Sequence, residues 1–164
     1  MKTERGGFRL LRQEQLLQEL VHDSYKSKRK RREPTRCPDC GAVYREGRWS
    51  WAEAPEKAHA ARCPACQRVH DGFPAGYVTL SGQFFAKHRE EVLGVVRRCE
   101  RAERAEHPLE RIMAIKPDAD ATLVTTTDTH LARRIGDALR DAYKGELEYR
   151  YNKEENLLRV AWSR

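Results

Sequence analysis

The sequence predicts an α+β protein in which a four-cysteine zinc ribbon precedes a ferredoxin-like sandwich of order β-α-β-β-α-β-β. Three observations support this prediction. Two Cys-Pro-x-Cys pairs are separated by 22 residues, helical and strand-like patterns alternate from residue 77 onwards, and basic residues are concentrated at the start of the chain. We therefore expect a basic helical or disordered arm over residues 1–36, the zinc ribbon over 37–82, and the sandwich over 83–164.

The predicted arm carries most of the net charge. The 164-residue chain holds 32 Lys and Arg against 25 Asp and Glu, a net charge of +7, and residues 1–36 hold 11 against 5. Leucines at helical spacing predict a helix over residues 9–25. The basic run that follows repels itself, and Pro34 ends any helix. Such an arm favours a polyanion, and nucleic acid is the commonest one in a cell. Its candidate contacts are Lys26, Lys28, Arg29, Lys30, Arg31 and Arg32.

The C-terminal half alternates between helical and strand-like segments. Apolar spacing predicts helices over 84–103 and 128–145, and the second has Asp128 or Thr127 as its N-cap and Gly145 just past its end. Short β-rich runs predict strands at 77–80, 110–117, 121–127, 146–152 and 157–163. The two helices would cover one sheet face and leave the other free. Cys99 falls on the apolar side of the first helix, as a core cysteine does.

Four cysteines form the pattern C-x2-C-x22-C-x2-C, which predicts one structural Zn²⁺ in a tetrahedral site. The predicted ligands are Cys37, Cys40, Cys63 and Cys66. Four sulfurs leave no open position for a substrate, so the pattern indicates a scaffold rather than a catalyst. Redox-active dithiols or disulfides are the alternatives. His59 and His70 lie nearby, and we expect them to be surface residues.

The segment between the cysteine pairs carries candidate nucleic-acid contacts at Arg45, Arg48 and Trp49. On one strand, Trp49 and Trp51 would point to the same face. They would either stack on nucleobases or cover the small core of the ribbon.

The start of the 128–145 helix is the other candidate contact. Free backbone N–H groups at a helix N-terminus attract phosphate. Further donors there are Thr127, His130, Arg133 and Arg134. The alternative is a capped helix with solvated arginines.

The motifs CPDCGAVY, GRWSW, CPAC, PAGYVTLSG, EHPLERI, TTTDTHLARRIGDAL and RVAWSR extend over about residues 37–164. Together they resemble a family of small bacterial zinc-ribbon proteins of unassigned function. The paired knuckles, the TTTDTHLARRIGDAL segment and the LLRVAWSR strand are more distantly similar to the archaeal and eukaryotic adaptor family for nuclear export of the large ribosomal subunit. That similarity implies binding to ribosomal RNA or the large subunit, with the four cysteines as zinc ligands. This chain has fewer knuckles, so export itself is not implied.

We favour a cytoplasmic, monomeric factor that binds ribosomal RNA or the large ribosomal subunit, in assembly, quality control or dormancy, without catalysis. A DNA-binding regulator is the first alternative, although Asp137 and Asp141 would meet phosphates if their helix entered a groove. An enzyme with a structural zinc is the second, and Asp128 and His130 are the pair it would use. The sequence shows no apolar run that could span a membrane and no secretory signal.

Overall fold

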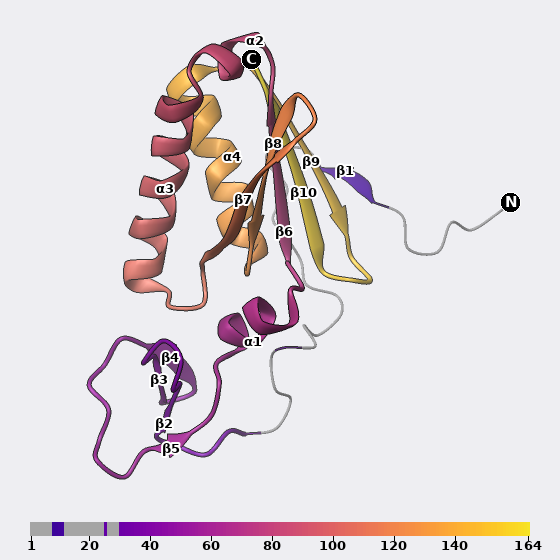
Figure 1. The fold of residues 1–164 in the computed structure, drawn as a ribbon. Helices are drawn as coiled ribbons and strands as arrows, with labels where there is room; N and C mark the ends of the chain where they lie inside the picture. Colours follow the sequence, from indigo (N-terminus) through magenta and orange to yellow (C-terminus); the bar gives the residue numbers. More distant parts are fainter. Residues whose placement is uncertain (1–7, 12–24, 26–29) are drawn as a thin grey trace, which may run out of the picture.

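The computed structural model describes residues 8–11, 25 and 30–164, which form a mixed α+β fold with two sheets (Figure 1). The strands of the larger sheet are β1 (Arg9–Leu11), β6 (Gly76–Ser81), β7 (Ile112–Asp118), β8 (Ala121–Thr126), β9 (Glu146–Asn152) and β10 (Leu157–Ser163). Their order is β1-β9-β10-β6-β8-β7. We call this sheet, with the helices that pack on it, the large unit.

The smaller sheet has the order β4-β3-β2-β5 and lies below one end of the large sheet in Figure 1. Its strands are β2 (Thr35–Arg36), β3 (Val43–Arg45), β4 (Arg48–Ser50) and β5 (His59–Ala60). Helix α1 (Pro64–Asp71) follows, and Gly72 ends it in the left-handed region at a φ of 64°. We call residues 30–72 the small unit. It contains the four cysteines of the sequence pattern.

Three helices cover one face of the large sheet: α2 (Gln83–Lys87), α3 (Arg89–Glu106) and α4 (Thr129–Tyr143). Alternate strand residues point toward them, because successive side chains of a strand face opposite ways. The fully buried side chains between sheet and helices include Val78, Leu80, Val92, Leu131, Ile135, Leu139, Leu158 and Trp162. Cys99 packs against this core, as its place on the apolar stripe predicts. None of the helices in the described residues is long and apolar enough to cross a bilayer.

The predicted strands and the second helix from residue 77 onwards are present, but the expected helix over 84–103 is two helices, α2 and α3, which meet at His88. The ferredoxin-like topology is not confirmed. The last strand, β10, lies between β9 and β6 and runs parallel to β6. In the expected arrangement, the strand after α4 would itself neighbour the first strand of the unit. Strand β6 belongs to the large sheet, although it lies within residues 37–82 of the expected ribbon segment.

The expected helix over residues 9–25 is wrong at its start. Arg9–Leu11 form β1, which pairs antiparallel with β9 at the edge of the large sheet. An edge strand leaves backbone N–H and C=O groups unpaired, and a short added strand satisfies them. The rest of that expected helix lies outside the described residues, apart from Tyr25. The Tyr25 ring stacks on the Phe73 ring, with 6.2 Å between the ring centroids.

Candidate metal centre

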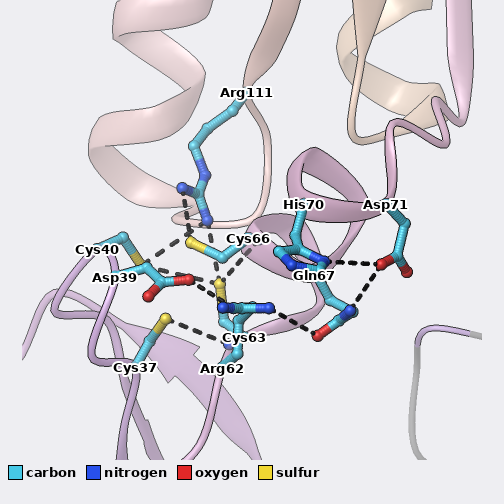
Figure 2. A network of polar contacts seen from close by, with 10 residues as sticks. All are labelled: Cys37, Asp39, Cys40, Arg62, Cys63, Cys66, Gln67, His70, Asp71 and Arg111. Atoms are coloured by element: carbon cyan, nitrogen blue, oxygen red, sulfur yellow. Dashed lines mark hydrogen bonds and ion pairs between the residues drawn. The ribbon is translucent and has the colours of Figure 1, made fainter.

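The four cysteines occupy two short turns that face each other (Figure 2). Cys37 directly follows β2, and the turn after it closes through a hydrogen bond of 2.9 Å from the Gly41 N–H to the Cys37 carbonyl. Cys63 is the N-cap of α1, with Pro64 in the first helical turn, and Cys66 lies in that same turn. Proline suits this position because it has no N–H to lose there. Both turns therefore present two sulfurs toward the space between them.

The donor set fits a single tetrahedral metal ion. The four Sγ atoms all lie within 4.8 Å of one another, and the Cys40 and Cys63 sulfurs are 3.8 Å apart. Metal–sulfur bonds of about 2.3 Å in a tetrahedron put sulfurs about 3.8 Å apart. A disulfide would need about 2.05 Å, and all five cysteines are free. The geometry therefore supports a metal-binding cluster over a disulfide, and four thiolates complete its coordination.

Backbone N–H groups donate to two of the sulfurs. The N–H of Cys63 donates to Cys37 Sγ at 3.3 Å, and the N–H of Cys66 donates to Cys63 Sγ at 3.4 Å. Such donors favour the anionic sulfur that a metal requires. Ala65 and the partly buried Trp49 and Leu109 pack around the cysteines, so the cluster lies in a small apolar core.

The closest cation belongs to the large unit. The Arg111 guanidinium donates from Nη1 to Cys66 Sγ at 3.2 Å and from Nη2 to Cys63 Sγ at 3.1 Å. The same Nη2 lies 3.7 Å from Cys40 Sγ. Figure 2 shows this side chain reaching down onto the sulfurs from the loop before β7. Only 8% of Arg111 is exposed, so this is a buried cation against a buried cluster of sulfurs.

Sequence reasoning missed Arg111. It lies one residue before β7, within the EHPLERI segment, where its charge predicts a solvent-exposed position. Arginine reaches a buried site only beside a compensating anion, and the sequence does not show which anion lies there. The sole hint is the EHPLERI motif among the segments that carry the family resemblance.

The pKa values of Cys37, Cys63 and Cys66 are shifted in different directions. Burial raises the pKa of the Cys63 thiol, although the Cys66 N–H and Arg111 act in the opposite direction. Burial also raises the pKa of Cys66, against the hydrogen bond from Arg111. At Cys37, burial acts upward too, but backbone hydrogen bonds, first that from Cys63, outweigh it and lower the pKa to about 7. Metal binding displaces the protons that remain, so metal affinity falls as the pH falls.

A polar network surrounds the cluster without touching the sulfurs. Arg62 donates from Nε to Asp39 at 2.6 Å, and Gln67 donates to Asp71 at 2.9 Å. The His70 ring also bonds Asp71, at 3.1 Å, and is largely exposed. His59 is exposed on β5. Neither histidine joins the metal cluster in the described residues, as the sequence predicts.

The predicted contacts in the arm and ribbon that the structure describes all lie on the small unit. Lys26, Lys28 and Arg29 lie outside the described residues, whereas Lys30 and Arg32 are exposed. The Arg31 guanidinium lies 5.8 Å from the Tyr44 ring centroid and 5.1 Å from that of Trp49. Arg45 and Arg48 are exposed directly opposite each other on the β3–β4 hairpin. The small unit therefore carries exposed cations on both sides of its hairpin, because Arg45 and Arg48 point away from the side of Tyr44 and Trp49, on which Arg31 lies.

The two tryptophans have partners inside the protein. Trp49 packs against the cysteine core and tilts onto Tyr44 at 5.4 Å between centroids. The Trp51 Nε1 donates to the Arg104 carbonyl at 2.6 Å, which connects the small unit to α3. The covering role is therefore supported for Trp49, whereas Trp51 is 39% exposed and contacts α3.

The four predicted contacts at the start of α4 all belong to the large unit. Thr127 is buried and its hydroxyl donates to the Leu109 carbonyl at 2.6 Å. Asp128 caps the helix by accepting from the N–H groups of His130 and Leu131, as the sequence predicts. The cap satisfies the donors that a phosphate would otherwise use. His130 itself is exposed.

The two arginines of this segment also contact their own fold. Arg133 lies 5.4 Å above the Tyr149 ring and 4.0 Å from the Asp137 carboxylate. Arg134 donates to Glu103 at 2.9 Å. Burial acts to raise the pKa of Glu103, but the hydrogen bond from Arg134 outweighs burial and lowers it.

Glu110 forms an acidic cluster with Glu103 and Asp128. Burial raises the pKa of Glu110 to about 8, with further contributions from Asp128 and Glu103. An exposed glutamate titrates near about 4.3. Folded Glu110 therefore keeps its proton at neutral pH, whereas the unfolded chain releases it.

This difference predicts a pH-dependent stability. Between about pH 4.3 and pH 8, Glu110 is protonated in the folded state and ionised in the unfolded chain. Its contribution to the free energy of unfolding therefore falls as the pH rises through that window. Glu110→Gln should remove part of this slope. Urea unfolding at several pH values from 5 to about 8.5 measures it, with Glu106→Gln at the exposed end of α3 as the control. A slope equal in the parent and Glu110→Gln would contradict the prediction.

Comparison with known proteins finds no matching family model, no matching curated protein and no matching solved structure. The geometry of the site therefore carries the functional interpretation.

Proposed function

We propose that this protein is a zinc-ribbon factor that binds RNA without catalysis, and that its target is ribosomal RNA or the large ribosomal subunit. The observation that carries the proposal is the excess of positive charge on the hairpin and on the segment before it. We call this set of cations the basic hairpin surface. It comprises Lys30, Arg31, Arg32, Arg36, Arg45 and Arg48.

The bound ion is Zn²⁺ in this proposal. Four thiolates in a tetrahedral arrangement select zinc over the harder divalent ions, which prefer oxygen ligands. With four sulfurs bound, no position is open for water or substrate. The ion would supply folding energy to the small unit and hold its hairpin in shape. We further propose that the large unit is a ferredoxin-like variant with one inserted strand.

The hairpin places like charges where they oppose each other. Arg45 and Arg48 form a cross-strand pair in the β3–β4 register. Like charges directly opposite on a hairpin are destabilising. No cation of the basic hairpin surface makes an ion pair within the part of the chain that the structure describes. An external anion would offset this repulsion.

Acidic neighbours compensate the surface only in part. The Glu33 carboxylate accepts from the N–H groups of Glu46 and Gly47 at 3.0 and 3.1 Å, so it is bound to the hairpin backbone. Asp39 is paired with Arg62 instead. The surface therefore keeps an excess of positive charge, and the basic run before it in the sequence adds to that excess.

The choice of RNA over DNA rests on α4 and on the resemblance. Helix α4 buries one face against the sheet and packs beside α3, and its Arg133 and Arg134 are paired with acids. No stripe of free donors remains on it to read a major groove. The family resemblance points to ribosomal RNA. A ribosomal role would place the protein in the cytoplasm.

A binding titration tests the proposal. A fluorescent fragment of large-subunit RNA is titrated with the full chain at several salt concentrations, with duplex DNA of equal length as competitor. We expect RNA affinity to fall steeply with salt, with a slope of about −0.7 per phosphate contact for single strands. Equal affinity for the DNA would favour the regulator alternative. An affinity for RNA that does not depend on salt would contradict the role of the basic hairpin surface.

A further inference from the structure

We infer that Arg111 joins the metal centre to the large unit, so that metal occupancy sets how the small unit sits on the sheet. The inference builds on the zinc centre proposed above and is independent of RNA. Arg111 comes from the large unit, and its guanidinium contacts three of the four sulfurs of the small unit. The ribbon is therefore a docked module whose docking depends on its metal.

Arg111 and the metal–thiolate cluster carry opposite charges that compensate each other. A divalent ion with four thiolates carries a net charge of about −2 in a buried site. Cys37 and Cys63 are fully buried, and Arg111 is 8% exposed. A buried charge is costly unless an opposite charge lies beside it. The positive charge of Arg111 compensates the buried sulfurs, and their negative charge compensates the buried guanidinium.

The guanidinium engages the sulfurs as a fork. Nη1 and Nη2 donate to two different sulfurs at 3.2 and 3.1 Å. A lysine ammonium presents no such planar pair of donors. The contact is therefore specific in geometry as well as in charge. The Nε atom of Arg111 has no partner among the described residues, so the sulfurs carry most of its polar contacts.

The backbone of Arg111 is held in place by Thr127, which lies between β8 and α4. Its N–H donates to the Thr127 hydroxyl at 2.9 Å, and the Thr127 N–H donates to the Arg111 carbonyl at 2.9 Å. The Thr127 hydroxyl also donates to the Leu109 carbonyl. A chain of contacts thus runs from the sulfurs through Arg111 to Thr127, directly before the N-cap of α4. This assigns a structural reason to the threonine that the sequence marked as a ligand contact.

Other connections between the units in the described residues do not involve the sulfurs as hydrogen-bond partners. Trp51 Nε1 bonds the Arg104 carbonyl, and Arg68 donates to the Phe73 carbonyl in the connecting loop. Leu109 adds apolar packing against the cysteine core. Without the ion, the sulfurs lose what holds them within 4.8 Å of one another, and Arg111 loses the anion that compensates its burial. The docking should then loosen.

The test compares Arg111→Met with Arg111→Lys and with Arg62→Met. Methionine keeps an unbranched apolar stem and removes the charge, whereas lysine keeps the charge and removes the fork. Arg62 is the matched arginine that pairs with Asp39 instead of sulfur. Zinc affinity is measured by competition with a chelating dye. We expect a loss of about 10- to 100-fold for Arg111→Met, the usual effect of removing an outer partner of a metal ligand. Arg62→Met should change it less than about fivefold.

The second readout is the relative orientation of the units. Residual dipolar couplings of the zinc-loaded full chain should fit one alignment tensor for both units in the parent and two separate tensors in Arg111→Met. The Co²⁺-loaded variant should keep the absorption of a tetrahedral four-sulfur site, which shows that the ribbon still folds. If Arg111→Met is insoluble, zinc affinity and the number of alignment tensors are measured on Arg111→Lys instead. Unchanged zinc affinity with a single tensor in the variant would overturn the inference. A parent chain that binds no zinc would instead overturn the proposed centre.

Discussion

Removing the metal with a strong chelator should unfold the small unit and leave the six-stranded sheet folded. Among the residues that the structure describes, the apolar core around the cysteines holds four buried residues, which are Cys37, Cys63, Ala65 and Cys66. So small a core cannot offset the entropy of ordering the chain around it. Structural zinc contributes about 10–16 kcal/mol in comparable peptides, which is the energy that would be lost. Cys37→Ser should have the same effect, since it removes one ligand.

The measurement is the amide NMR spectrum before and after chelation. Signals of residues 35–72 should collapse to random-coil positions, while those of β6 to β10 keep their dispersion. Cys99→Ser is the control, because Cys99 packs against the large core and lies outside the cluster. A dispersed spectrum for residues 35–72 in the absence of metal would show that the cluster does not stabilise the fold.

Neutralising the hairpin arginines should reduce RNA binding and leave the fold intact. Arg45→Gln with Arg48→Gln removes two exposed cations without a partner in the described residues. Two lost phosphate contacts lower the salt slope by about 1.4 and the affinity about 25-fold at 0.1 M salt. Thermal stability should hold or rise slightly, because the two like charges no longer oppose each other.

The matched control lies on the other unit. Arg98 and Arg101 are exposed on α3, and their change to glutamine removes the same charge from the chain. Affinity and salt slope should then stay close to those of the parent. Equal losses in both double variants would mean that net charge alone drives the binding. An unchanged RNA affinity in the Arg45→Gln, Arg48→Gln variant would show that the basic hairpin surface does not bind RNA.

Local patterns predicted most of the secondary structure. The helix over 128–145 has a strong apolar stripe and an aspartate cap, and α4 with its Asp128 cap matches it. The hairpin at the C-terminus and the two strands before α4 also appear as expected. The cysteine spacing predicted the cluster, because thiol pairs three residues apart converge within a single turn. These features depend on neighbours in sequence, so the sequence shows them directly.

Features that depend on tertiary neighbours could not be predicted in this way. The residues of β1 have leucine spacing that fits a helix, and only the open edge of β9 makes them a strand. The place of β10 between β9 and β6 depends on long-range pairing. Arg111 is the clearest case, because its partners are more than 40 residues away. Burial of a charge is visible only when the opposite charge is placed beside it.

Sedimentation of the tagged protein from the cells that produce it tests the RNA-binding role most directly. Lysates are run through a sucrose gradient at low and at high salt. We expect the protein to migrate with large ribosomal subunits at low salt and to move to the top at high salt, since the contact is with phosphate. The Arg45→Gln, Arg48→Gln variant should leave the subunit fractions at lower salt than the parent. Migration at the top of the gradient under all conditions, growth and starvation alike, would contradict a ribosomal target.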